Sequence, residues 1–154
     1  MKSFLLLVTN LTLFLFPARS SPPPVIRQPL GAISQSEQSL QYIVDQEGQV
    51  FNQASVSALP LLLMAQAPHN LDRDDLSSLK ILNRLSNLVS TRVVGQIQDG
   101  ILIIQTPTTQ FLFNPSQNSD SWYTSLQQLI ARSRIDGKLP HKIDLRFTHP
   151  IITY

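Results

Sequence analysis

The sequence predicts an α+β fold: a mostly antiparallel sheet, built from a hairpin and a meander, with two helices packed on it. Three observations support this prediction. Short runs of strand-forming residues are bounded by turn-forming residues over most of the chain. Two longer segments instead place apolar residues three and four positions apart, which is the period of a helix. The expected order is hairpin, extended segment, helix, three-strand meander, helix and last strand.

Composition limits the class of protein. The 154 residues are enough for one compact domain, or for a domain with a short additional segment. Charged residues make up only 14% of the chain and the net charge is +2, so we expect a weakly charged surface. Lysine and arginine form no phosphate-binding cluster, so no nucleic-acid partner is expected. Because the chain has no cysteine, disulfides, thiolate catalysis and cysteine-ligated metals are excluded.

Residues 1–21 have two interpretations. Lys2 is followed by the apolar stretch Ser3–Phe16, which is shorter than the roughly twenty residues of a membrane span. Its length suits the apolar core of a signal peptide, and Ala18-Arg19-Ser20 supplies small residues for cleavage. We therefore expect a signal-peptide-like segment or a marginal anchor. The alternative is a strand of the domain, since Val8–Phe16 is rich in strand formers.

Residues 22–34 are expected to be a linker with one short strand. The run Pro22-Pro23-Pro24 lacks amide donors and cannot form a helix or a central strand. The pattern of Val25–Ile33 predicts a short strand, broken at Gln28-Pro29. The compact domain is then expected over residues 35–154.

A hairpin and an extended segment come next. Leu40–Val44 is rich in strand formers, Asp45–Gly48 is a cluster of turn residues, and Gln49–Phe51 is the returning strand. The following apolar run, Val56–Met64, contains Pro60, which cannot donate to a sheet ladder. We therefore expect that run to be a buried edge strand or an extended segment.

Leu71–Val89 is predicted to be a helix. Acidic residues from Asp72 to Asp75 complement the free amides and the dipole of a helix N-terminus. An apolar stripe follows at helical spacing, which is typical of a helix packed on a core. The stripe consists of Leu76, Leu79, Leu82, Leu85 and Leu88, widened by Ile81 and Val89.

The last part of the chain is predicted to hold a meander, a second helix and a final strand. The three strands of the meander are Arg92–Ile97, Ile101–Thr106 and Gln110–Asn114, with a strong turn signal at Asp99-Gly100. The helix is expected over Asp120–Arg134 and ends before Gly137. Its apolar face would consist of Trp122, Leu126, Leu129 and Ile130. The final strand is expected over Lys142–Tyr154.

No pattern for catalysis, a cofactor or a metal is present in the sequence. The histidines (His69, His141 and His149) lack metal-ligand spacing. The acids around Asp74 lack the glycine and glutamate of a calcium loop. Neither a phosphate-binding glycine loop nor a Gly-x-Ser-x-Gly elbow occurs. We therefore expect a protein that is not an enzyme and that binds no cofactor.

The start of the final strand has two interpretations. Alternate strand residues share a face, so Asp144 and Arg146 are expected on one face, and Ile143, Leu145 and Phe147 on the other. The first interpretation is an ordinary half-buried strand with a weak ion pair on one face. The second is an exposed strand edge that accepts a strand of another chain.

Four stretches match motifs of one bacterial family in their order and spacing. Val25–Ala32, with Arg27 and Pro29, is similar to a Glu-Arg-x-Pro-x-Ala stretch, although isoleucine here replaces the glutamate and glycine displaces the alanine. The hairpin, with Asp45 and Gly48, resembles an Asp-x-x-Gly turn followed by an apolar pair.

The other two stretches lie further along the chain. Leu59–Leu62, with Pro60, resembles a Leu-Pro element. Ile143-Asp144-Leu145-Arg146-Phe147 resembles an Ile-Asp-Leu-Arg-Tyr motif. Together the four stretches resemble the extracytoplasmic β domain of the bacterial cell-division family FtsQ, called DivIB in other bacteria. In that comparison the chain is either a shortened or late-started member, in which Val8–Phe16 is a remnant of POTRA strands, or a divergent relative with its own export signal. Residues 22–34 are then a linker or the end of the POTRA-like segment, and residues 35–154 are the β domain.

The resemblance implies a function. FtsQ is a non-enzymatic divisome scaffold of the inner membrane, whose β domain lies on the periplasmic side and binds the small coiled-coil proteins FtsB and FtsL through its last strands. The N-terminal anchor and most of the POTRA domain would then be missing from this chain. Carried over by motif, the partner-binding residues are Arg146, Phe147, Thr148, Ile151, Ile152 and Tyr154. Pro150 interrupts this stretch and favours an edge position.

Two other functions remain open from the residues alone. The chain could be an unrelated secreted or periplasmic protein-binding module with a cleaved signal peptide. A small exported enzyme is the third class, and the missing catalytic pattern disfavours it.

Overall fold

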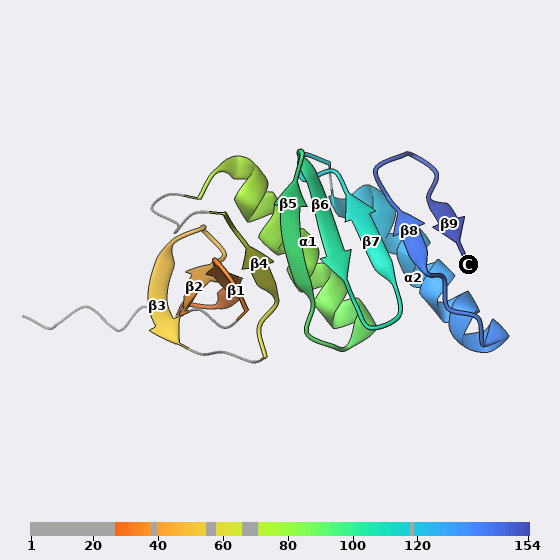
Figure 1. The fold of residues 1–154 in the computed structure, drawn as a ribbon, viewed down its shortest axis with the longest axis horizontal. Coiled ribbons are helices and arrows are strands. Elements are labelled where there is room, and N and C mark those ends of the chain that lie inside the picture. Colours follow the sequence, from red (N-terminus) through yellow and green to blue (C-terminus); the bar gives the residue numbers. More distant parts are fainter. Residues whose placement is uncertain (1–26, 38–39, 55–57, 66–70, 118) are drawn as a thin grey trace, which may run out of the picture.

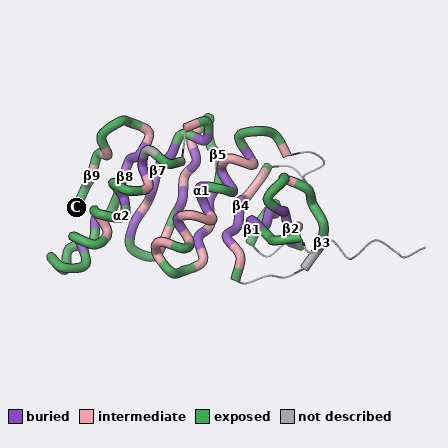
Figure 2. Tube along the Cα trace, turned by 180° about the vertical axis from the view of Figure 1, so that it is seen from behind, coloured by how far each residue is buried: buried purple, intermediate pink, exposed green. Residues whose placement is uncertain are grey.

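The computed structural model of the chain describes residues 27–37, 40–54, 58–65, 71–117 and 119–154. Over these residues nine strands form one sheet, and two helices, α1 (Arg73–Val89) and α2 (Ser119–Asp136), lie on the same side of it (Figures 1 and 2). In chain order the strands are β1 (Pro29–Ser34), β2 (Gln41–Asp45), β3 (Val50–Ala54), β4 (Leu61–Leu63), β5 (Val94–Gln98), β6 (Ile101–Gln105), β7 (Gln110–Phe113), β8 (Lys142–Asp144) and β9 (Ile151–Thr153). The two interpretations of residues 1–21 concern a segment outside the described residues.

The predicted α+β class is confirmed. Among the described strands the order across the sheet is β3-β2-β1-β4-β5-β6-β7-β8-β9. Five of the eight pairings are antiparallel, and the other three (β1–β4, β4–β5 and β7–β8) are parallel. The parallel pairs are joined by long connections, since α1 separates β4 from β5 and α2 separates β7 from β8.

The predicted hairpin is β2–β3, and the predicted meander is β5–β6–β7. The hairpin turns at Gly48, whose φ of +84° lies in the region that glycine adopts without strain. The strand expected over Val25–Ile33 begins instead at Pro29 and continues to Ser34, while residues 25 and 26 lie outside the described residues. Pro29 can open this strand because the first residue of a strand need not donate to the ladder.

β4 corrects the prediction of an edge position for the Pro60 segment. Its residues pair with β1 on one side and with β5 on the other, so β4 is a central strand. Pro60 precedes the strand. It contributes to the pairing with β1 through its carbonyl oxygen, which accepts a hydrogen bond from the Ala32 amide at 2.8 Å. Leu61 and Leu62 are both fully buried, as expected for a strand covered on both faces.

α1 begins at a reciprocal cap. The Asp72 carboxylate accepts from the Asp75 amide at 2.7 Å, and the Asp75 carboxylate accepts from the Asp72 amide at 3.1 Å. The predicted leucine stripe faces the sheet, with Leu79, Leu82 and Leu85 fully buried. The predicted helix and its role in the core are therefore confirmed.

Close packing of α1 against the sheet depends on a glycine in β5. A β-carbon added at Gly95 would lie 2.9 Å from Leu82 Cδ2 and 3.2 Å from Leu102 Cδ1. The missing side chain lets the helix approach the sheet closely at this point. α2 covers the neighbouring part of the same face, where the Trp122 ring packs edge-on against Phe113 with centroids 4.7 Å apart.

The final strand predicted over Lys142–Tyr154 is wrong as one element. The structure has two short antiparallel strands, β8 and β9, joined by a loop. β8 ends because Asp144 Oδ1 accepts from the Arg146 amide at 3.2 Å, a local hydrogen bond that turns the chain. Ile143 and Leu145 are buried as predicted, whereas Phe147 is exposed and does not join them.

Candidate functional site

The residues predicted to bind a partner lie together at one end of the sheet. We call residues 146–154, which comprise β9 and the loop before it, the C-terminal edge. β9 pairs with β8 along one side, where the His141 amide donates to the Thr153 carbonyl at 2.8 Å. Because β9 is the last strand in the order, no described strand covers its outer side. Figure 1 shows β9 at the opposite end of the molecule from β3.

The C-terminal edge is apolar and exposed. Phe147, Ile151 and Tyr154 retain 52%, 55% and 64% of their accessible surface. Ile152 alternates with these residues and is half-buried, because its register partner in β8 is the buried Ile143. A strand edge with unpaired backbone groups and exposed apolar side chains is suited to pairing with another chain.

An ion pair holds the start of the loop. Arg146 Nη2 and Nε lie 2.6 Å and 2.9 Å from the two carboxylate oxygens of Asp144, which is a bidentate contact. The hydrogen bonds from Arg146 hold the pKa of Asp144 below its ordinary value, although burial of the carboxylate opposes this effect. The Arg146 guanidinium also lies 5.5 Å from the ring centroid of Phe147. The predicted ion pair is therefore present, and it positions the base of the loop.

Two depressions flank Pro150, between the loop and α2. One is lined by Ser125, Leu129, Ile152 and neighbouring residues, and has a volume of about 400 Å³. The other is lined by Trp122, Ser125, Phe147 and neighbouring residues, and has a volume of about 160 Å³. Both depressions lie beside the edge of the sheet, so a chain added to β9 would also contact α2.

The sequence predicted the α2 residues that lie beside β9 only as part of the hydrophobic core. The helical pattern placed Leu129 in the apolar face without indicating that it would lie next to the last strand. Ser125 carried no signal, because a serine on a helix is ordinary surface. Their position depends on the crossover from α2 to β8, which the order of elements alone does not determine.

The other motif residues are divided among three parts of the sheet. Asp45 is buried, and its Oδ2 forms an ion pair with Arg27 Nη1 at 3.2 Å. Its Oδ1 accepts from the amides of Glu47 and Gln49 at 3.1 Å and 2.8 Å. The structure therefore brings Arg27 and Asp45 together at the hairpin, whereas Pro60 precedes β4 and the Ile143–Leu145 motif forms the strand beside β9.

The described residues contain no group of three or more His, Cys, Asp or Glu side chains that could hold a metal ion. Within this same part of the chain, neither helix combines the length and apolar composition of a membrane span. His141 and His149 are exposed, and His69 lies outside the described residues.

One hollow was indicated by no sequence pattern. It lies between the C-terminal ends of α1 and α2 and has a volume of about 290 Å³. Its lining residues come from four segments between residues 89 and 143, which include Val89, Thr109, Ile130 and Leu139. A linear motif could not have revealed a site of this kind.

The chain matches no family model and no curated protein. The resemblance to FtsQ therefore stays a prediction.

Proposed function

We propose that this chain is a non-enzymatic interaction domain of the bacterial cell envelope: a divisome scaffold, resembling FtsQ, that binds small coiled-coil division proteins of the FtsB and FtsL kind. The observation that carries the proposal is the C-terminal edge. It combines an outer strand, β9, with three exposed apolar side chains, Phe147, Ile151 and Tyr154. The matching motifs at Asp45-x-x-Gly48 and Ile143–Phe147 add support through their order in the sequence.

The mode of binding is strand addition. A partner strand would pair its backbone with β9, which gives affinity, while pockets beside the edge select its side chains. The depressions on either side of Pro150 provide such pockets. Because the buried Ile143 fixes β8 in the core, β9 is held on a rigid neighbour and needs little ordering before it binds.

In this proposal the domain lies on the periplasmic side of the inner membrane and associates with it through the N-terminal segment or a segment upstream. It contacts other division proteins, does no chemistry and needs no cofactor. Nucleic acid is not a partner, since the net charge of +2 supplies little attraction for phosphates.

The test is binding of the purified chain to the periplasmic parts of the coiled-coil division proteins, measured by calorimetry. Phe147→Ala and Ile151→Asp should each weaken binding about tenfold or more, as expected for exposed apolar anchors that become buried. Both variants should melt within a few degrees of the natural chain, because both side chains are largely exposed.

The matched control is Val50→Asp. Val50 is also an exposed apolar residue in an outer strand, but it lies in β3 at the opposite end of the strand order. Binding should survive this change. If Phe147→Ala and Ile151→Asp bind as tightly as the natural chain, the C-terminal edge is not the docking surface.

The signal-peptide-like residues 1–21 favour one alternative, a secreted binding module unrelated to division. The mass of the exported protein, together with its binding to the coiled-coil division proteins, separates the two functions. A mature chain beginning at Ser21 that binds no coiled-coil division protein would establish the alternative and contradict the scaffold.

A further inference from the structure

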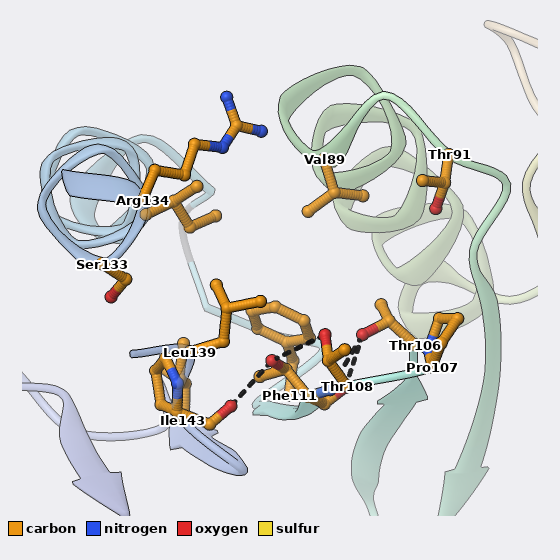
Figure 3. A pocket seen from close by; sticks show the side chains of 13 residues that line it. Val89, Thr91, Thr106, Pro107, Thr108, Phe111, Ser133, Arg134, Leu139 and Ile143 are labelled. Carbon is orange, nitrogen blue, oxygen red and sulfur yellow. Dashed lines mark hydrogen bonds between the residues drawn. The ribbon is translucent and has the colours of Figure 1, made fainter. Parts of the chain in front are cut away.

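The hollow between the helices lies at the ends of three structural units. α1 ends at Val89, α2 nears its end at Ser133 and Arg134, and the β6–β7 turn supplies Thr106 and its neighbours. Figure 3 shows the side chains of Val89 and Ser133 on opposite sides of the hollow, with Leu139, Phe111 and Ile143 below them. The cavity of about 290 Å³ thus lies between the helix ends above and the sheet below, and it opens to the surface.

The walls of the cavity are mostly hydrocarbon. Val89, Phe111, Ile130, Leu139 and Ile143 contribute only carbon atoms from their side chains. Such a wall favours an apolar ligand, because water gains few hydrogen bonds in a space of this kind.

The threonine hydroxyls on the turn do not make the cavity polar. Thr109 Oγ1 donates to the Pro140 carbonyl at 2.7 Å, and Thr106 Oγ1 donates to the Thr109 carbonyl at 2.9 Å. Thr106 Oγ1 also accepts from the Thr109 amide at 3.1 Å. The Thr106 hydroxyl is therefore engaged with the backbone of the turn, and the Thr109 hydroxyl with the segment that precedes β8, so both already have hydrogen-bond partners within the protein.

One positively charged side chain is found among the described residues that line the cavity, and it lies at the rim. Arg134 lines the cavity, and Figure 3 shows its guanidinium extending from α2 toward the α1 side. Within the described residues no carboxylate forms an ion pair with Arg134, and no acidic residue lines the cavity. By contrast Arg132, two residues earlier in α2, pairs with Asp136 at 3.6 Å.

We propose that this cavity binds a small amphipathic carboxylate of the fatty-acid type, with its hydrocarbon chain between the helices and its carboxylate at Arg134. The charge pattern selects this class: apolar walls receive the chain, and the guanidinium at the mouth pairs with one anion. The cavity has about twice the volume of one that holds a benzene ring, so it accepts a chain of about ten carbons. No residue of the C-terminal edge lines this cavity.

The full-length protein is titrated with decanoate and, separately, with the uncharged decanol. Decanoate is kept below the concentration at which decanoate forms micelles. Saturable binding of one decanoate per chain is expected, and binding of decanol should be weaker. Arg134→Gln should lower the affinity for decanoate roughly threefold, as an exposed ion pair allows, and leave decanol unchanged. Arg132→Gln is the matched control on the same helix and should change neither affinity.

Two variants locate the site in the cavity. Val89→Phe from α1 and Ser133→Phe from α2 each fill the space from a different wall and should abolish decanoate binding. Two separate walls are used so that at least one variant keeps its fold, judged by an unchanged circular dichroism spectrum.

Three results would overturn the proposal. The first is the absence of saturable decanoate binding. The second is full binding by a folded cavity-filling variant. The third is decanol binding as tightly as decanoate in the natural chain, which would show that Arg134 does not select an anion.

Discussion

Replacement of Asp45 by alanine tests how the β2–β3 hairpin is held. The two oxygens of this buried carboxylate have separate partners. Oδ1 accepts from the amides of Glu47 and Gln49 across the turn, and Oδ2 pairs with Arg27 at 3.2 Å. An alanine removes all three contacts at once.

The expected loss follows from these contacts. Each backbone hydrogen bond to the carboxylate is worth about 1 kcal/mol net, because Glu47 and Gln49 are exposed and water can replace part of it. The Arg27 ion pair adds less than about 1 kcal/mol, since the arginine side chain is 38% exposed. Asp45→Ala should therefore lower the free energy of unfolding by about 2 to 3 kcal/mol. For a chain of this size that corresponds to a fall in Tm of about 4 to 12 °C.

Asp45→Asn is the matched comparison. Its carbonyl oxygen can replace Oδ1 and keep both turn hydrogen bonds, while its amide group faces the Arg27 guanidinium and loses the ion pair. Asp45→Asn and Arg27→Gln should each cost less than about 1 kcal/mol. Urea denaturation followed by circular dichroism measures all three variants. If Asp45→Asn costs as much as Asp45→Ala, the ion pair and not the turn hydrogen bonds holds the hairpin, and the reasoning is refuted.

Three further predictions concern the core and the response to acid. Gly95→Ala should lower the free energy of unfolding by about 1 to 3 kcal/mol, because the new methyl group overlaps Leu82, and the loss should shrink in a Leu82→Ala background in a double-mutant cycle. The free energy of unfolding of the natural chain should exceed that of Asp144→Asn by its full amount above pH 3.8, and this difference should decrease as the pH falls further. The reason is that Arg146 holds the folded-state pKa of Asp144 below that value. Asp75→Asn should show the opposite sign: burial raises the pKa of Asp75 above 3.8, so the natural chain gains stability relative to the variant as the pH falls through that raised pKa. Denaturant titrations between pH 2 and 7 measure the difference in unfolding free energy between the natural chain and each of these two variants. If the two differences change with pH in the same direction, the assigned pKa shifts of Asp144 and Asp75 are contradicted.

The local elements could be predicted because their signals lie within a few residues. The Asp45–Gly48 turn depends on one side chain that bonds its own backbone and on one glycine with a positive φ. α1 depends on the cap at Asp72 and on the spacing of its leucines. These interactions are short in sequence, so the residues alone specify them.

The candidate site was predictable only in part. The motif around Ile143–Phe147 drew attention to the right end of the chain, and the exposed apolar residues of the C-terminal edge lie there. The prediction of a single long strand was wrong, because the same alternation of apolar and charged residues also occurs in a strand that ends at an aspartate turn. Periodicity cannot decide between backbone pairing and a local side-chain hydrogen bond.

The sequence by itself determined the α+β class, the hairpin, the meander, both helices and the absence of cysteine chemistry. The tertiary structure alone decided that β4 lies in the centre of the sheet, that β9 forms its outer strand, and that the ends of α1 and α2 enclose a cavity. The physical reason is the range of the interactions. Caps, turns and helical stripes form between near neighbours in the chain, whereas strand order and cavities depend on contacts between segments tens of residues apart, which no local pattern encodes.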